Sequence, residues 1–157
     1  MDSDVFTPES NDRDIAELGD YTNAQVVDEL ERGMSEAGPV LAGSDGMWDG
    51  VAFGEWVHAG DVREALGEPE VYGRPGLPDA LALLARATRE WRDYVPLEAD
   101  LDDVDEPLQL GKTGGERPPA RFSGDGPTLV RLYTGRSVEG SVYELTGVEA
   151  KELNIFA

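Results

Sequence analysis

The sequence predicts an α+β protein with a helical first part and a β-rich end. Apolar residues recur at the three- and four-residue spacing of helices between residues 22 and 94, and alternate in the two-residue pattern of strands after residue 128. No strand–helix–strand alternation is visible, which argues against a parallel α/β sheet. We therefore expect a small helical core followed by a C-terminal antiparallel β segment. The expected regions are an extended or disordered arm over 1–20, a helical region over 21–96, an acidic and Pro/Gly-rich linker over 97–127, and a β hairpin plus a terminal strand over 128–157.

The first predicted helix spans about residues 22–37. Thr22 and Gln25 have the spacing of a capping box, in which each side chain accepts a hydrogen bond from the other residue's backbone amide. Gly38 and Pro39 are expected to end this helix. Its apolar residues follow at helical spacing, namely Val26, Val27, Leu30 and Met34.

Two further helices are predicted after a Gly-rich, aromatic stretch at residues 40–60, which is expected to be a loop with a short strand or turn packed on the core. Asp61 has the position of an N-cap, with Glu64 three residues later, and this predicts a short helix over 61–66. The longest apolar seam predicts a helix over about 78–94. That seam consists of Leu77, Leu81, Leu84, Thr88, Trp91 and Val95.

After residue 96 the sequence predicts a linker and a loop, followed by strands. The acidic run at residues 97–106 predicts a solvated linker, with association of cations as the alternative, because its aspartates lack the spacing of an EF-hand loop. Residues 107–127 are rich in Pro and Gly and predict a loop. TLVRLY at 128–133 predicts a strand, SVEGSVYEL predicts the return strand, and the final KELNIFA predicts a further short strand.

The chain is strongly acidic, since 33 Asp and Glu against 13 Lys and Arg give a formal net charge of −20. The basic residues are 11 Arg and 2 Lys, and the acids are spread along the whole chain. This composition resembles that of proteins from halophilic archaea and their viruses. A large negative charge is tolerated at ~1 M salt, because a Debye length of about 3 Å screens surface carboxylates from one another. The alternative is an acidic mesophilic regulator. In both cases sequence-specific binding of nucleic acid is not expected, because that needs a basic footprint.

Several classes of chemistry lack the residues that they need. With no Cys and one His, a single chain cannot form a disulfide, a thiolate nucleophile or a multi-His metal site. No apolar run approaches the ~20 residues of a membrane span, and the acidic N-terminus is unlike a targeting signal. Lys112 sits in a GKT triplet without the earlier Gly of a phosphate-binding loop, and His58 has no recognisable nucleophile or orienting acid. We therefore expect a protein that is not an enzyme and has no cofactor or resident metal, apart from non-specific cation association with surface carboxylates.

A family resemblance lies in the middle of the chain. Residues 61–67 read DVREALG, and after a loop the sequence continues LPDALALLARATREWRDYV. Over residues 61–95 this order resembles the head–tail connector (adaptor) proteins of tailed viruses, which carry a short helix of the type DVKxxLG, a loop and a longer helix with an aromatic-rich end. The matching positions are Val62, Leu66, Leu81, Leu84, Ala87, Trp91 and Tyr94. The resemblance implies a ring-forming protein without catalytic residues, bound below a portal.

The residues that stand out as candidate partner contacts are apolar or basic in an otherwise acidic chain. They are Phe6 in the arm, Trp48 and Trp56 in the aromatic stretch, Arg86, Arg89 and Arg92 on the longest helix, and Leu153, Ile155 and Phe156 at the end.

The expected function is that of a structural protein in the virion of a halophilic tailed virus, assembled in the host cytoplasm. We expect a homo-oligomer that contacts portal or tail proteins and has no membrane or sequence-specific nucleic acid as a partner. A minor capsid or decoration protein of the same virion is the first alternative. An acidic regulatory or inhibitor protein that binds a basic partner is the second.

Overall fold

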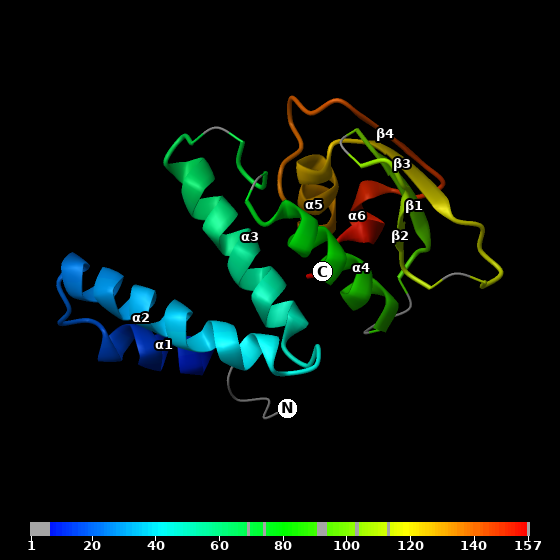
Figure 1. Ribbon diagram of the computed structural model, residues 1–157. Coiled ribbons are helices and arrows are strands. Elements are labelled where there is room, and N and C mark those ends of the chain that lie inside the picture. The colour runs from blue at the N-terminus through cyan, green and yellow to red at the C-terminus, as the bar shows by residue number, and fades with distance from the viewer. Residues whose placement is uncertain are drawn as a thin grey trace. The chain divides into compact units, whose positions relative to one another are not determined.

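The computed structural model describes residues 7–68, 70–73, 75–90, 94–102, 104–112 and 114–156. This described part forms six helices and a four-stranded mixed sheet, and four of the helices precede the first strand (Figure 1). The α+β class predicted from the sequence is therefore confirmed. The chain divides into two compact units, residues 1–46 and residues 47–157.

The first unit begins with helix α1 (Pro8–Glu17), where an extended or disordered arm was predicted over residues 1–20. Thr7 is the N-cap and forms a capping box with Ser10, with both backbone-to-side-chain distances at 3.1 Å. The prediction was wrong here because the helix is polar and its capping box has Ser in place of the usual Glu or Gln. Phe6 lies outside the described residues.

Helix α2 (Asn23–Ala42) starts as predicted and ends later than predicted. The amide of Thr22 donates to Gln25 Oε1 at 2.9 Å, which confirms the capping box. The helix continues through Pro39, although a proline lacks the backbone N–H and crowds the preceding turn, and the carbonyl of Pro39 remains an acceptor. That carbonyl accepts from the amide of Gly43 at 3.0 Å.

The second unit opens with helix α3 (Asp49–Ala65). Residues 43–48 form turns, but the rest of the predicted 40–60 loop is helical, and the helix predicted over 61–66 is the end of α3 and not a separate helix. The buried side of α3 consists of Phe53, Val57 and Gly60, at the four- and three-residue steps of one helical face. Gly60 is a packing requirement here. A Cβ at this position would lie 2.3 Å from the ring of Tyr72, which crosses the helix at that point.

Helix α4 (Leu77–Glu90) confirms the longest apolar seam within these bounds, and the remainder of the prediction falls partly on residues 91–93, outside the described part. Thr88 is the polar member of this seam, and its buried hydroxyl oxygen accepts a hydrogen bond from the amide of Gly111 at 3.1 Å. The buried residues of α4 are Leu77, Ala80, Leu81, Leu84, Ala85, Ala87 and Thr88.

The sheet has the strand order β2-β1-β3-β4 and is mixed, not purely antiparallel as predicted. Strands β1 (Leu97–Leu101) and β3 (Ala120–Gly124) are parallel neighbours, and β2 (Leu108–Leu110) pairs antiparallel with β1. These strands occupy parts of the linker predicted over 97–127, and the described residues between them form loops. The acidic run predicts a solvated linker, but in β1 the acids alternate with Leu97, Ala99 and Leu101. The strand buries these three residues and turns its acids to the other face of the sheet.

The C-terminal part contains one strand where three were predicted. Residues 128–133 belong to helix α5 (Gly126–Thr134), the return strand is limited to β4 (Tyr143–Thr146), and the end forms the short helix α6 (Ala150–Leu153). β4 pairs antiparallel with β3. Helix signals at both ends of α5 outweighed its β-prone residues. Asp125 accepts from the amide of Thr128 at 2.6 Å, and Gly135 ends the helix with a positive φ of 69°.

The core of the second unit lies between the sheet and the helices. Contacts join α4 to β2, α5 to β3, and α5 to both α4 and α6, and Figure 1 shows these three helices on one side of the sheet. The largest fully buried side chains of this core include Tyr72, Tyr133, Phe53, Phe122, Leu84, Leu97, Leu110 and Leu129. The opposite face of the sheet is open to solvent, with Asp100, Arg121 and Ser123 exposed.

Candidate functional site

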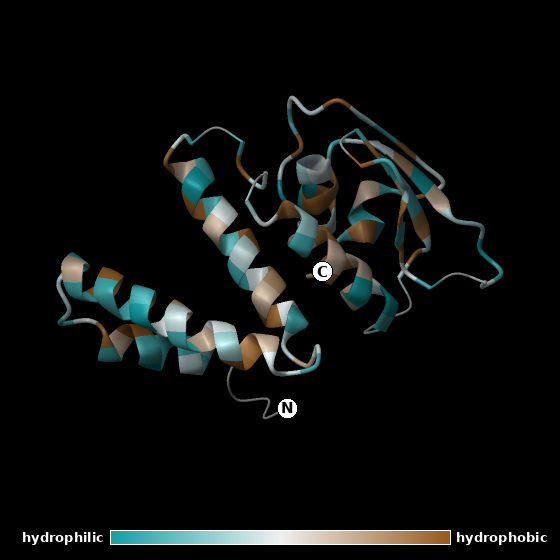
Figure 2. Ribbon diagram, viewed as in Figure 1, coloured by the Kyte–Doolittle hydropathy of each residue, from teal (hydrophilic) through white to brown (hydrophobic). Residues whose placement is uncertain are grey.

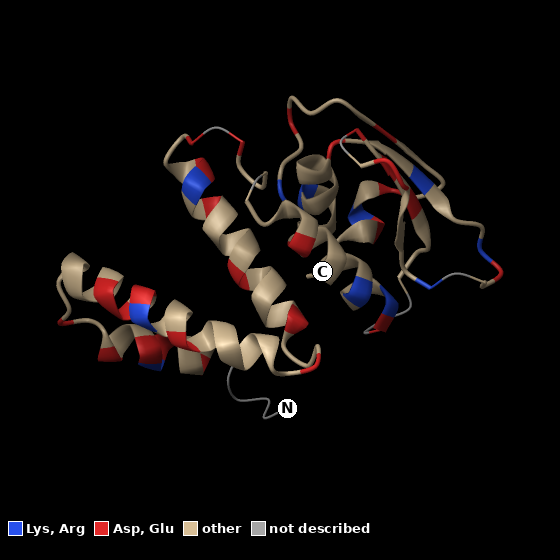
Figure 3. Ribbon diagram, in the orientation of Figure 1, with Lys and Arg blue, Asp and Glu red and all other residues tan. Residues whose placement is uncertain are grey.

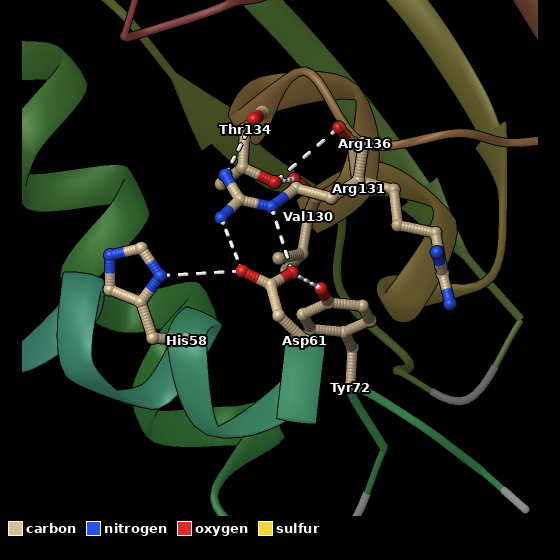
Figure 4. A network of polar contacts seen from close by, with 7 residues as sticks. All are labelled: His58, Asp61, Tyr72, Val130, Arg131, Thr134 and Arg136. Carbon is tan, nitrogen blue, oxygen red and sulfur yellow. Dashed lines mark hydrogen bonds and ion pairs between the residues drawn. The ribbon is translucent and has the colours of Figure 1, made fainter. Parts of the chain in front are cut away.

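A polar cluster around Asp61 joins charged and polar side chains of the second unit (Figure 4). The Asp61 carboxylate, on α3, accepts from Arg136 through Nη2 at 2.7 Å and through Nε at 3.1 Å. It also accepts from the hydroxyl of the buried Tyr72, in the loop before α4, and lies 3.3 Å from His58 Nδ1. Arg136 follows the C-cap of α5 and donates to the carbonyl of Thr134 at 2.7 Å. Asp61 therefore connects three segments of the chain.

The ionisation of this cluster is fixed by its own contacts. Hydrogen bonding to Arg136 holds the pKa of the Asp61 carboxyl well below its ordinary value, and the bond from Tyr72 acts in the same direction. Burial, together with the bond to Asp61, raises the pKa of Tyr72 to about 12. The bond to Asp61 also raises the pKa of Arg136. At neutral pH the cluster therefore contains an ionised carboxylate, a guanidinium and a neutral phenol.

Arg131, on α5, adds a second link between the same segments. Its Nη2 donates to Glu64 Oε1 at 2.7 Å, and its guanidinium carbon lies 4.6 Å from the centre of the Tyr72 ring. The Tyr72 side chain thus has a cation over its ring and a carboxylate at its hydroxyl. Apart from His58, whose side chain is 71% exposed, the charged and polar groups of the cluster engage one another. This arrangement is suited to joining α3 to α5.

An acidic hollow of about 300 Å³ lies on the open face of the sheet. Arg121 is directly opposite Glu98 in the β1–β3 register, and Gln109 Nε2 donates to Glu98 at 3.2 Å. Two of the aspartates from the predicted linker, Asp100 and Asp105, line this hollow. The full lining is Glu98, Asp100, Asp105, Pro107, Arg121, Phe122, Ser123, Glu144 and Thr146. Among the described residues, no three His, Asp or Glu side chains are grouped so that they could hold a metal ion.

The first unit carries an apolar face that the unit does not bury. Within α2, apolar residues recur at steps of three and four over Val27, Leu30, Met34, Ala37 and Leu41, which we call the α2 seam. No residue of α2 is buried, and Figure 2 shows apolar bands along this helix. The exposed fractions are 60% for Val27, 62% for Leu30 and 51% for Met34. The two flanking valines, Val26 and Val40, are 40% and 65% exposed.

The predicted arginine contacts on α4 are engaged within the second unit. Arg86 Nε lies 2.5 Å from Asp49 Oδ2, as a close ion pair without ordinary hydrogen-bond geometry. Arg89 Nε donates to the carbonyl of Ala85 in its own helix at 3.0 Å. Arg92 lies outside the described residues, as Phe6 does.

The predicted apolar contacts divide between the core and the surface. Leu153 is 1% exposed and belongs to the core, because α6 packs it against α5, so it is not an accessible contact residue. Trp56 is partly buried and packs on Tyr72 at 5.9 Å between ring centres. Trp48 is half-buried at the start of α3. Ile155 packs partly against the core, whereas Phe156 is 57% exposed, with the Arg136 guanidinium 5.9 Å from its ring centre.

The predicted residues therefore do not converge on one site. The sequence contained no sign of the Asp61 cluster, because Asp61 and Arg136 are 75 positions apart. The spacing of Val27, Leu30 and Met34 predicts the apolar face of a helix, but that pattern alone does not tell a core face from a docking face.

The comparisons with known proteins add no relative. No protein-family model matches the chain, and no curated protein or solved structure is significantly similar to it. A search of the described helices for a membrane span finds none of sufficient length and apolarity.

Proposed function

We propose that the protein is a non-catalytic, acidic protein-binding component of a larger assembly. The observation that carries this proposal is the α2 seam, because three of its large apolar side chains are more than half exposed. Exposed apolar residues in a continuous row are characteristic of binding surfaces, whereas single exposed apolar residues are ordinary. The internal engagement of the Asp61 cluster supports the non-catalytic part of the proposal.

The test is site-specific photo-crosslinking in the cells from which the protein comes. A photoreactive phenylalanine analogue replaces Leu30 in the seam, and the same analogue replaces Ser35, which lies on the same helix off the seam. We expect a discrete crosslinked product from position 30 and none from position 35. Equal products from the two positions, or none from either, would contradict the proposal.

A narrower form of the proposal places the protein in the neck of a halophilic tailed virus, as a head–tail connector that forms a ring between portal and tail. The Arg-rich acidic composition and the sequence of residues 61–95 support this form. The four-stranded sheet is no part of that resemblance, which leaves a minor capsid or decoration protein of the same virion as the alternative. Light scattering at about 2 M salt, with purified portal and tail proteins, tests it. A ring that binds either component supports a neck position, and a monomer that binds neither argues against it.

A further inference from the structure

We infer that the α2 seam receives a basic amphipathic helix of a partner protein, an inference that rests on the proposed function. The spacing of the seam points to a helix. Apolar residues at alternating steps of three and four present the a and d positions of a heptad pattern, which pack against the side chains of a second helix. From Val27 to Leu41 the row is about 21 Å long at 1.5 Å per residue, which matches about four turns of a partner helix.

The charge of the first unit points to a basic partner. Residues 1–46 contain twelve Asp and Glu against two Arg. Both arginines already have acidic neighbours, because Arg32 Nη2 lies 2.5 Å from Glu29 Oε1 and Arg13 Nε lies 3.6 Å from Asp14 Oδ1. Figure 3 shows that most of the charged residues on α1 and α2 are acidic.

A basic helix fits these charges better than a second copy of this chain. A second copy would bring a net charge of the same sign against this unit, whereas lysines or arginines beside the apolar stripe of a partner would be attracted to the acids of α2, of which Glu31 flanks the seam. The backbone at Gly33, beside the seam, is also open, because a Cβ there would meet nothing within 4 Å. Side chains of a partner helix therefore have room on that flank.

The chain has no cysteine, so a single introduced thiol can be labelled at one position only. The experiment uses the full-length variants Leu30→Cys, in the seam, and Ser35→Cys, off the seam, each carrying an environment-sensitive fluorophore. The probe is a synthetic helical peptide of about four heptads with Leu at a and d and Lys at e and g. One control peptide has Glu at e and g, and a second is a scrambled form of the Lys peptide.

We expect the Lys peptide to shift the fluorescence at position 30 to the blue and to leave position 35 unchanged. At about 0.5 M salt the Glu peptide should bind at least about tenfold more weakly, and this difference should shrink at about 2.5 M salt, where charges are screened. The scrambled peptide should produce no shift. No shift with the Lys peptide, or an equal shift with the scrambled peptide, would overturn the inference.

Two further outcomes identify a different occupant and also overturn the inference. A blue-shifted label at position 30 without peptide, in a dimer by sedimentation, would assign the seam to a second copy. The same shift in a monomer would show that the seam is not available. The proposed function is judged separately, because a position-specific crosslink in cells to a partner without a basic helix would sustain it while this inference failed.

Discussion

Asp61 shows how a single side chain can join segments that are remote in sequence. Its carboxylate accepts hydrogen bonds from Arg136 and from the hydroxyl of the buried Tyr72. Removal of this carboxylate would therefore deprive both residues of a charged acceptor. A buried donor left without its acceptor is destabilising by about 1–3 kcal/mol. The residue that the sequence predicted as an N-cap is therefore a tertiary link.

The pH dependence of stability follows from the depressed pKa of Asp61. The unfolded chain takes up this proton near the ordinary pKa of 3.8, whereas the folded chain keeps the carboxylate ionised to lower pH. The stabilisation is thus complete above that value and is lost as the pH falls toward the folded pKa. We expect Asp61→Asn to lower the free energy of unfolding by about 2 kcal/mol at pH 7. The difference from the unsubstituted protein should narrow in urea titrations as the pH falls from about 5 to about 2.

The control for this prediction is Glu64→Gln. Glu64 also pairs with an arginine, but its side chain is 50% exposed, so this ion pair contributes little to the free energy of unfolding. Glu64→Gln should therefore change that free energy little. An unchanged pH profile in Asp61→Asn would refute the role assigned to this carboxylate.

Two glycines on α3 offer a matched pair of substitutions. A Cβ at Gly60 would lie 2.3 Å from the Tyr72 ring, whereas a Cβ at Gly54 would meet nothing within 4 Å. We expect Gly60→Ala to lower the free energy of unfolding by about 2 kcal/mol or more through overpacking. Gly54→Ala should raise it by about 0.5–1 kcal/mol, because alanine is the better helix former. Chemical denaturation of the two variants checks both values, and the same sign for both would contradict the packing described for α3.

Tyr133 has a buried hydroxyl that finds no hydrogen-bond partner among the described residues. Burial also raises the pKa of this phenol, which is therefore neutral at all physiological pH. Because an unpaired buried hydroxyl is unfavourable, Tyr133→Phe should leave stability unchanged or raise it by about 1 kcal/mol. Denaturation of the variant measures this, and a clear loss of stability would mean that the hydroxyl is paired in solution.

The helices illustrate which local signals predict an element and which do not. The capping box at Thr22 and Gln25 and the long seam of α4 predicted their helices well, because both are short-range patterns. Strand β1 was missed since its acids face solvent while its apolar residues alternate inward. The β-prone residues of α5 predict a strand, but the helix signals at its two ends decide its structure.

The N-cap of α5 provides a test of that explanation. The Asp125 carboxylate accepts from the Thr128 amide at 2.6 Å, so Asp125→Ala should lower stability by about 1 kcal/mol. Asp125→Asn keeps an acceptor and should recover most of that loss. Thermal unfolding of the two variants compares them directly, and an equal loss in both would argue that the cap is not what stabilises this helix.

At the scale of the whole molecule, the net charge of −20 makes stability dependent on salt. The acids repel one another at low ionic strength and are screened at high ionic strength. We expect the free energy of unfolding to rise between about 0.05 M and 2 M KCl, with loosening of the fold below about 0.5 M. Unchanged circular dichroism and an unchanged unfolding midpoint after dialysis to about 0.05 M would contradict this expectation.

The α+β class could be predicted from the sequence, whereas the sheet topology and the Asp61 cluster could not. Both depend on pairings between distant positions, such as the parallel register that aligns Leu97 with Ala120. The α2 seam was partly predictable from the sequence. Its residues are visible in the sequence, but only the structure shows that they are exposed.

The α2 seam, as proposed, is a binding surface and not part of the protein's own core. The most direct test is the free energy of unfolding of the triple variant Val27→Ser, Leu30→Ser, Met34→Ser. If these side chains are exposed in the free protein, the value should stay within about 0.5 kcal/mol per substitution of the unsubstituted protein, as for surface positions. A loss of more than about 4 kcal/mol, of the size seen when core residues are truncated, would contradict the claim.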